Sequence, residues 1–260
     1  MSEPLGEHDA AWVNVDPSVP RWLPDGSAFL WSSERDGSWR LELRDAKGAV
    51  TRTLTAGDFG YRGVIDLDPA RKIAVVAGSS DPSSSAVYNV SIDGGAPTVV
   101  GRFDKGGIVT AQFGESHDVF VQMEASLQSM PKWYVRTTDG RGRWELPSVA
   151  EAPAALPNVQ LVTVGPQNVR AAVVRPRAFD AKKKYPVIDA AYGGPGVVTV
   201  VHNASGYLRM QWIADATGAI VVAIDARGTP NRGREWERAI AGKLGAVPLE
   251  GHVAALQGLA

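Results

Sequence analysis

Short stretches of alternating apolar and polar residues fill the first 150 positions, and turn residues separate them. Residues 39–44, Trp-Arg-Leu-Glu-Leu-Arg, alternate with a period of two, which is typical of a β-strand with one buried face. Residues 34–37, Glu-Arg-Asp-Gly, end in a pair that favours a tight hairpin because glycine accepts positive φ angles. The pattern therefore predicts antiparallel strands joined by short turns.

Three rounds of strands and turns follow one another in this part of the chain. A turn that contains an aspartate recurs once in each round, and Asp45, Asp93 and Asp139 lie 48 and 46 residues apart. Four short antiparallel strands in a repeat of roughly 40–50 residues are typical of the blades of a β-propeller. We therefore predict a partial β-propeller of about three blades, preceded by a strand at residues 11–15 that completes a neighbouring blade.

The fold of this part has one alternative. Regular short strands with Asp-Gly turns also suit a β-sandwich, but the visible internal period favours the propeller. A closed propeller has at least four blades, so about three blades close a ring only with further blades or by oligomerisation. We expect four tryptophans to pack within or between the blades, namely Trp31, Trp39, Trp133 and Trp144.

The pattern changes after a Pro/Ala-rich linker at residues 151–157. Strand patterns then alternate with helical ones, which predicts an α/β sheet covered on both faces. Residues 219–225 are almost all apolar, as in a strand buried on both sides of a parallel sheet. One helical face is predicted to contain Leu208, Trp212 and Ala216. The predicted strands are 159–164, 169–174, 187–191 and 219–225, and the predicted helices are 207–216, 235–241 and 249–260.

Candidate chemistry lies where these strands end, because sites in α/β sheets form at the carboxyl ends of the strands. Two loops leave such ends, Tyr-Gly-Gly-Pro-Gly at residues 192–196 and Asp-Ala-Arg-Gly-Thr-Pro at residues 225–230. The first has the composition of a loop that supplies an oxyanion donor, and Tyr192 carries a hydroxyl that can donate. Its alternative role is a ring that only packs. For Asp225 and Arg227 we favour a structural role, in which they pair or anchor neighbouring loops.

Composition narrows the classes of binding partner that we expect. The 260 residues carry 27 basic and 28 acidic side chains, which gives no indication of binding to nucleic acid or to a membrane surface. The absence of cysteine excludes disulfides, thiolate catalysis and cysteine-ligated zinc. The polar N-terminus is not a signal peptide, and no apolar run approaches the ~20 residues that span a bilayer. The helical pattern runs to the last residue without a cap, so we expect a chain cut short.

These segments together resemble a known family. Residues 29–37, Phe-Leu-Trp-Ser-Ser-Glu-Arg-Asp-Gly, are similar to a propeller stretch of the dipeptidyl peptidase IV branch of the prolyl oligopeptidase family of serine peptidases. Residues 185–187, residues 192–195, Trp212 and residues 225–228 follow in the order and spacing of that family. The resemblance implies a propeller that caps an α/β-hydrolase domain. Residues 1–150 are then the C-terminal part of the propeller, and residues 151–260 the N-terminal part of the catalytic domain, ending before the nucleophile elbow.

The resemblance also implies roles for single residues. The tyrosine in the position of Tyr192 donates its hydroxyl to the tetrahedral intermediate, which makes it the one catalytic residue predicted in this chain. In this fold the serine sits on a Gly-x-Ser-x-Gly elbow, followed by the acid and the base. The sequence contains no such elbow, so the nucleophile, acid and base are not in the chain. The four histidines precede the place of the elbow, and none is therefore the catalytic base: His8, His117, His202 and His252.

One departure from the family lies at Gly251, where relatives commonly carry an acidic residue. We expect this difference to affect helix packing or an ion pair and not the chemistry. The paired glutamates that bind the substrate amine in the dipeptidyl branch lie upstream in the propeller and are not visible here. Dipeptide release is thus implied by the resemblance alone.

Two classes of function compete. The leading hypothesis is part of a serine peptidase that hydrolyses peptide bonds by acyl transfer, inactive by itself because the triad is absent. The alternatives are a non-catalytic interaction module built on the propeller, and the acylaminoacyl or prolyl endopeptidase branch of the family. The expected partner is a peptide substrate, with no cofactor, no metal and no nucleic acid. The full-length protein is compatible with a homodimer, and the compartment stays open between cytoplasm and periplasm.

Overall fold

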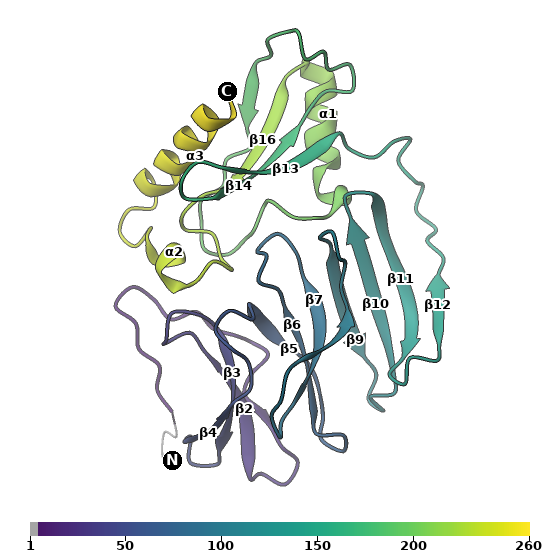
Figure 1. Ribbon diagram of the computed structural model, residues 1–260, viewed down its shortest axis with the longest axis vertical. Helices are drawn as coiled ribbons and strands as arrows, with labels where there is room; N and C mark the ends of the chain where they lie inside the picture. Colours follow the sequence, from purple (N-terminus) through teal and green to yellow (C-terminus); the bar gives the residue numbers. More distant parts are fainter. Residues whose placement is uncertain (1–4) are drawn as a thin grey trace. The chain divides into compact units, whose positions relative to one another are not determined.

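The computed structural model of the protein describes residues 5–260, and the chain folds as two compact units (Figure 1). The first unit contains the described residues up to Lys105, with Val109–Glu124 and Trp133–Pro147. The second unit contains Gly106–Ile108, Ala125–Lys132 and Ser148–Ala260. The tip of one hairpin of the third sheet thus belongs to the second unit.

Three four-stranded sheets follow one another along the chain, and each holds its strands in sequence order. All strand pairs of the first two sheets are antiparallel, as is the last pair of the third. Such consecutive hairpins build propeller blades, whereas the strands of a sandwich alternate between two sheets. The first sheet consists of β1 (Arg21–Trp22), β2 (Ala28–Ser33), β3 (Arg40–Asp45) and β4 (Val50–Thr53). The second consists of β5 (Tyr61–Asp68), β6 (Ile73–Gly78), β7 (Ala86–Ser91) and β8 (Thr98–Gly101), and the third of β9 (Ile108–Phe113), β10 (Val119–Ser126), β11 (Ser129–Thr137) and β12 (Arg143–Leu146).

The recurring aspartate turns lie where the period of the sequence places them, between the last two strands of each sheet. The Asp45 carboxylate accepts the backbone N–H groups of Lys47 and Ala49, both at 2.9 Å. The Asp139 carboxylate accepts the N–H of Arg141 at 3.0 Å in the third sheet. The Asp45 and Asp139 side chains thus serve as acceptors within their turns, whereas the Asp93 carboxylate of the second sheet pairs with Lys72 at 3.0 Å.

The sequence pattern did not predict the first strand of each sheet, which is β1, β5 or β9. The pairing of β5 with β6 shifts register twice, so β5 does not keep a period of two. The prediction of a strand at residues 11–15 is wrong. These residues form no strand, and Val13 and Val15 are exposed because no neighbouring strand covers them.

The core of the first unit lies between successive sheets. In β6, Ala74 and Val76 join one buried cluster with Leu30 of β2, while Val75 joins a second cluster with Val109 of β9. Both faces of β6 are therefore covered, which is why its sequence is apolar throughout.

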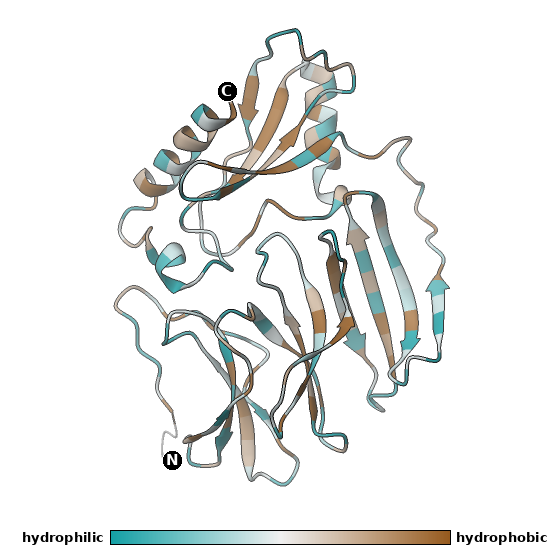
Figure 2. Ribbon diagram, viewed as in Figure 1, coloured by the Kyte–Doolittle hydropathy of each residue, from teal (hydrophilic) through white to brown (hydrophobic). Residues whose placement is uncertain are grey.

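The prediction that all four tryptophans pack in the blades is corrected for two of them. Trp31 and Trp39 are partly buried, and Trp39 packs against the first cluster. Trp133 and Trp144 are exposed, at 40% and 59%. They lie on β11 and on the edge strand β12, all four residues of which are exposed. Figure 2 shows β12 as largely hydrophilic, in keeping with an outer strand.

The second unit contains a mixed sheet in the order β13-β14-β16-β15. The pairs β13–β14 and β14–β16 are antiparallel, and β15–β16 is parallel. The predicted parallel setting of the apolar strand at 219–225 therefore holds on one side only. The strands are β13 (Val159–Val164), β14 (Val169–Val174), β15 (Val187–Asp189) and β16 (Ile220–Asp225), and the helices are the 3₁₀-helix η1 (Ala204–Tyr207), α1 (Leu208–Thr217), α2 (Arg234–Arg238) and α3 (Ala246–Leu259).

Helices cover both faces of this sheet, as expected. Val221 and Ala223 of β16 form one cluster with residues of α1, and Val222 and Ile224 form another with Ala255 of α3. Figure 2 shows β16 in hydrophobic colours along its length. The alternation of side chains thus places α1 and α3 on opposite faces.

The face predicted for the first helix is wrong. The buried residues of α1 are Met210, Gln211 and Ala214, whereas Trp212 is 69% exposed. Gln211 is buried because it is fully used, donating to the Arg175 carbonyl at 3.1 Å and accepting the Asn158 N–H at 2.6 Å. The face of α1 that is buried is therefore set by the hydrogen bonds of Gln211 to backbone groups at the strand ends, and not by the number of apolar side chains on a face.

Asp16 connects the N-terminal segment to two sheets of the first unit. Its carboxylate accepts the hydroxyls of Ser32 in β2 at 2.7 Å and of Tyr61 in β5 at 2.8 Å. Ser18 donates to the same carboxylate, and its hydroxyl accepts the Val64 N–H at 2.8 Å. Burial and then the Asp16 charge raise the pKa of Tyr61, so this hydroxyl stays a donor.

We predict that Tyr61→Phe lowers the free energy of unfolding by about 1–3 kcal/mol, because Asp16 loses a donor in a buried setting. The matched control is Tyr88→Phe. The Tyr88 ring packs on Phe59, and its hydroxyl has no hydrogen-bond partner among residues 5–260, so we expect a change within about 0.5 kcal/mol. Urea denaturation of the two variants and the wild type measures the difference. Equal effects of the two changes would contradict the role of Asp16.

The raised pKa of Tyr61 also predicts a dependence on alkaline pH. The unfolded chain releases this proton near pH 10, whereas the folded chain retains it, so the stabilisation is present below pH ~10 and is lost as the pH rises further. The difference in unfolding free energy between wild type and Tyr61→Phe should therefore narrow above pH ~10. A difference that stays constant from pH 8 to 11 would refute this expectation.

Candidate functional site

The candidate site lies at the carboxyl end of the parallel pair β15–β16. Asp189 of β15 is paired with Val222, and the Ala190 N–H donates to the Val222 carbonyl at 2.8 Å, one residue beyond the strand. The chain then leaves the sheet into the loop at residues 191–196. The predicted strand at 187–191 is therefore two residues shorter by pairing, and Tyr192 begins the exposed loop.

This loop lies against the first turn of α3. A Cβ atom on Gly193 would overlap the Pro248 ring, so only glycine allows this approach. The Tyr192 ring folds back along the loop, because a Cβ on Gly194 would lie 3.1 Å from the Tyr192 hydroxyl. The two glycines thus bring the loop close to the helix and make room for the ring.

Tyr192 itself is 36% exposed. Within the described part of the chain, its hydroxyl has no hydrogen-bond partner, so its O–H is free to donate to an acceptor. This is the chemistry that an oxyanion donor requires. Its role in catalysis stays a prediction.

His252 of α3 reaches the same loop. Its Nδ1 lies 2.7 Å from Asp189 Oδ2, and its Nε2 lies 3.2 Å from the Tyr192 carbonyl oxygen. The His252 side chain is only 5% exposed. From the sequence, His252 was excluded as the catalytic base, and this contact was not predicted. The sequence feature that could have predicted the contact is the position of His252 four residues after Pro248, which places both residues on one face of α3.

Asp225 anchors the chain that follows the loop. Its carboxylate accepts the Thr199 N–H at 2.9 Å, the Thr199 hydroxyl at 2.6 Å and the Val200 N–H at 2.9 Å. Arg227 instead reaches Glu250 of α3 at 3.5 Å. The two residues therefore serve separate contacts.

Gly251 lies at a close contact between α3 and the loop after β16. A Cβ at this position would lie 2.6 Å from the Ala226 Cβ, so α3 approaches the loop after β16 more closely than a side chain allows. The expectation of a packing difference therefore has a specific contact behind it.

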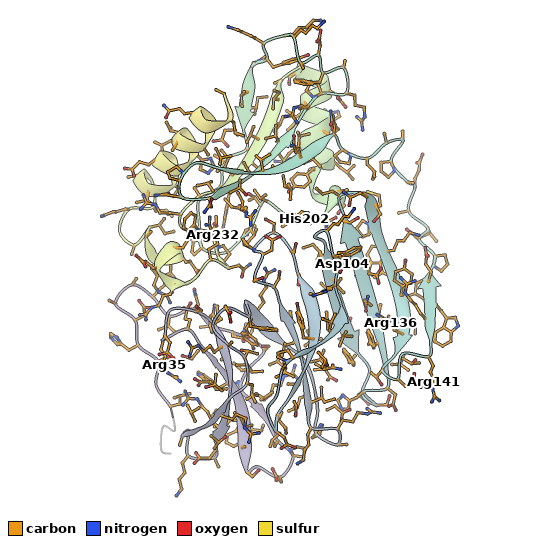
Figure 3. The ribbon with its side chains drawn as sticks, viewed as in Figure 1. Arg35, Asp104, Arg136, Arg141, His202 and Arg232 are labelled. Carbon is orange, nitrogen blue, oxygen red and sulfur yellow. The ribbon has the colours of Figure 1, made fainter. Side chains whose placement is uncertain are left out.

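Two further contacts hold the surroundings of the site. The buried Tyr207 hydroxyl accepts the Val201 N–H at 2.7 Å and donates to the Val201 carbonyl at 2.9 Å, and burial raises the pKa of Tyr207. Arg232, labelled in Figure 3, donates to the carbonyls of Asn168 and Gln167 at the β13–β14 turn. Its guanidinium lies 3.7 Å from the centroid of the Trp236 ring. These contacts fix both loops that flank the site.

Residues 5–260 contain no group of three or more His, Cys, Asp or Glu side chains arranged to hold a metal ion. In the same residues no helix is both long and apolar enough to cross a bilayer. The described residues therefore give no evidence for a metal ion or a membrane as a partner of the site.

Comparison with known proteins gives two matching family models. Residues 3–131 match the dipeptidyl peptidase IV (DPP IV) N-terminal region, and residues 204–260 match the prolyl oligopeptidase family. The chain belongs to the prolyl oligopeptidase family, in its dipeptidyl peptidase IV branch. Tyr192 lies between the two matched ranges, so the match does not test its role.

Relatives of this branch cover most of the chain. A probable dipeptidyl-aminopeptidase B of Aspergillus clavatus is 30% identical over 219 residues, which are 78% of this chain and 23% of the relative. A second, from Coccidioides posadasii, is 28% identical over 246 residues, 92% of this chain and 24% of the relative. The chain thus spans about a quarter of the length of these family members.

Solved structures share the fold. Dipeptidyl peptidase 4 of Porphyromonas gingivalis matches with a TM-score of 0.78 at 23% identity, over 92% of this chain and 34% of that protein. A putative dipeptidyl aminopeptidase IV of Bacteroides ovatus matches with a TM-score of 0.78 at 21% identity, over 91% of this chain and 37% of that protein. At these identities the likeness establishes the fold of the family.

We predict that Asp225→Asn lowers the free energy of unfolding by about 1.5–3 kcal/mol, because one amide N–H₂ then faces a donor instead of accepting from it. The control is Asp180→Asn in a surface loop. Among residues 5–260 the Asp180 carboxylate accepts the Lys182 N–H alone, so we expect a loss of less than about 1 kcal/mol there. Thermal and urea denaturation compare the two. A loss no greater at Asp225 than at Asp180 would contradict the anchoring role.

Proposed function

We propose that this chain is part of a serine-type peptidase that hydrolyses peptide bonds by acyl transfer. Membership of the dipeptidyl peptidase IV branch supports the reaction class. The sequence holds no Gly-x-Ser-x-Gly elbow, so in this proposal the nucleophile, acid and base are supplied by residues outside these 260. Residues 1–150 serve as the C-terminal part of a propeller, and residues 151–260 as the N-terminal part of an α/β-hydrolase domain.

Tyr192 is the residue of this chain that we assign to the reaction. When a serine attacks a peptide carbonyl, negative charge develops on the carbonyl oxygen. A donor aimed at that oxygen stabilises the transition state more than the substrate, which accelerates the chemical step. The observation that carries the assignment is that Tyr192, which is 36% exposed, has a hydroxyl without a partner among residues 5–260, on a loop at the carboxyl end of β15.

The substrate we propose is the N-terminus of a peptide, from which a dipeptide is released. The match of residues 3–131 to the dipeptidyl peptidase IV N-terminal region favours this specificity over the acylaminoacyl and prolyl endopeptidase branches. The relatives named dipeptidyl-aminopeptidase B point the same way.

The 260-residue chain by itself is expected not to hydrolyse Xaa-Pro or Xaa-Ala p-nitroanilides, because it has no serine elbow. The measurement is release of p-nitroaniline by the purified chain against a buffer blank. A longer product of the same gene that also carries the elbow should cleave both substrates. Turnover by the 260 residues alone would overturn the assignment of the nucleophile to outside residues. Failure of the longer product to cleave would favour a non-catalytic interaction module.

In that longer product, Tyr192→Phe should lower kcat by about 10²–10³-fold with little change in KM, because the ring stays and only the donor is lost. The control is Tyr185→Phe. The Tyr185 hydroxyl accepts the Asp180 N–H at 2.7 Å, away from the loop, so kcat should stay within about twofold. A kcat for Tyr192→Phe equal to that of the control would remove Tyr192 from the mechanism.

A further inference from the structure

We propose that His252 is the positioning residue of Tyr192, and that both of its ring nitrogens are protonated when it joins the Tyr192 carbonyl to the Asp189 carboxylate. The functional meaning of this inference rests on the proposed role of Tyr192. The contact itself does not rest on that role, because it joins α3 to Asp189 of β15 and to the loop at residues 191–196.

The protonation follows from the two atoms that His252 faces. A backbone carbonyl oxygen can only accept a hydrogen bond, and so can an ionised carboxylate. With Nδ1 at 2.7 Å from Asp189 Oδ2 and Nε2 at 3.2 Å from the Tyr192 oxygen, both nitrogens must donate for both contacts to be hydrogen bonds. A neutral ring would direct one lone pair at an oxygen lone pair in a nearly dry site.

The charge of Asp189 supports the same state. Asp189 Oδ1 is buried and has no hydrogen-bond partner in the described chain, so His252 is the contact that balances this carboxylate. Burying an oxygen of a partly exposed carboxylate without a partner is costly, and an imidazole that donates to the other oxygen offsets part of that cost. On the loop after β16 and on α3, Arg227 and Glu250 pair with each other at 3.5 Å.

Three contacts then fix the backbone around Tyr192. The Ala190 N–H is bound to Val222 of the sheet, the Tyr192 carbonyl is bound to His252, and Gly193 packs on Pro248. They lie before, at and after Tyr192, so its Cα has no freedom to shift without breaking one of them. Of the three, only the His252 contact holds the peptide group of Tyr192 itself. A donor displaced by about 1 Å loses much of its catalytic effect. By holding the Tyr192 backbone, His252 therefore affects how well the Tyr192 hydroxyl can act.

Two amide substitutions separate the two nitrogens. The side-chain nitrogen of glutamine can take the place of Nε2 and donate to the Tyr192 carbonyl, whereas that of asparagine can take the place of Nδ1 and donate to Asp189 only. His252→Gln and His252→Asn are both neutral, so they share the loss of charge. They differ in whether the Tyr192 carbonyl keeps a donor.

The first test uses NMR on the 260-residue chain labelled with ¹⁵N. We expect the ¹⁵N signals of both His252 ring nitrogens to be those of hydrogen-bond donors in the folded chain. Backbone amides 192–194 should shift in His252→Asn, and hydrogen exchange of the Ala190 N–H, which is bonded to Val222, should accelerate about tenfold or more. In His252→Gln they should remain near wild type. A singly protonated His252, or equal disturbance of the loop by both variants, would overturn the proposal even if both variants unfold at the same urea concentration.

The second test uses kinetics of the longer product that carries the serine elbow. His252→Asn should lower kcat by about 10²-fold with KM within about twofold, His252→Gln should retain most of kcat, and His252→Asn combined with Tyr192→Phe should fall little below Tyr192→Phe alone. If Tyr192→Phe leaves kcat unchanged, the proposed catalytic role of Tyr192 fails while the NMR test of His252 still stands. If Tyr192→Phe lowers kcat and His252→Asn does not, the positioning role fails.

Discussion

The second unit depends on the burial of β16 on both faces. Its side chains alternate between two clusters, with Val221 and Ala223 on the side of α1 and Val222 and Ile224 on the side of α3. Because a strand offers its two faces in strict alternation, this one segment determines which helix covers which face. The position of α3 is what brings Pro248 and His252 to the loop after β15. The candidate site is therefore a consequence of core packing before it is a matter of polar contacts.

The same constraint operates in the first unit, where β6 is buried between the first and third sheets through Ala74 and Val76 on one side and Val75 on the other. Outer strands are not subject to burial on both faces. The edge strand β12 exposes all four of its residues, and a large side chain such as Trp144 there covers little. Inner strands are thus specified by apolar packing, and outer strands by their turns.

This division explains what the sequence could predict. The ranges of β13 and β14 match the predicted strands at both ends, and the helix at α1 ends at Gly218 in the left-handed conformation that glycine favours. The pattern failed at β5, whose irregular pairing hides the period, and at Trp212, which an apolar count places in the core although Gln211 holds the helix instead. It also gave no sign of the two His252 contacts, because they join this residue to the Asp189 carboxylate 63 positions away and to the Tyr192 backbone carbonyl 60 positions away. Local patterns record burial along one element, whereas such contacts depend on where two elements meet.

Asp189 and Asp225 show how two similar residues at the ends of parallel neighbours come to act differently. Asp225 is surrounded by donors from Thr199 and Val200, so its carboxylate is satisfied by one short stretch of chain and fixes it. Asp189 finds its donor on a helix instead, and keeps one oxygen without a partner among the described residues. The histidine that serves Asp189 has a second nitrogen, and that nitrogen reaches the Tyr192 carbonyl. The backbone of Tyr192 is therefore held through its carbonyl, so that its hydroxyl, which contacts no partner in the described chain, needs to play no part in holding the loop. Because the Tyr192 hydroxyl is not needed to hold the loop, it is available to donate to an acceptor that enters the site from outside.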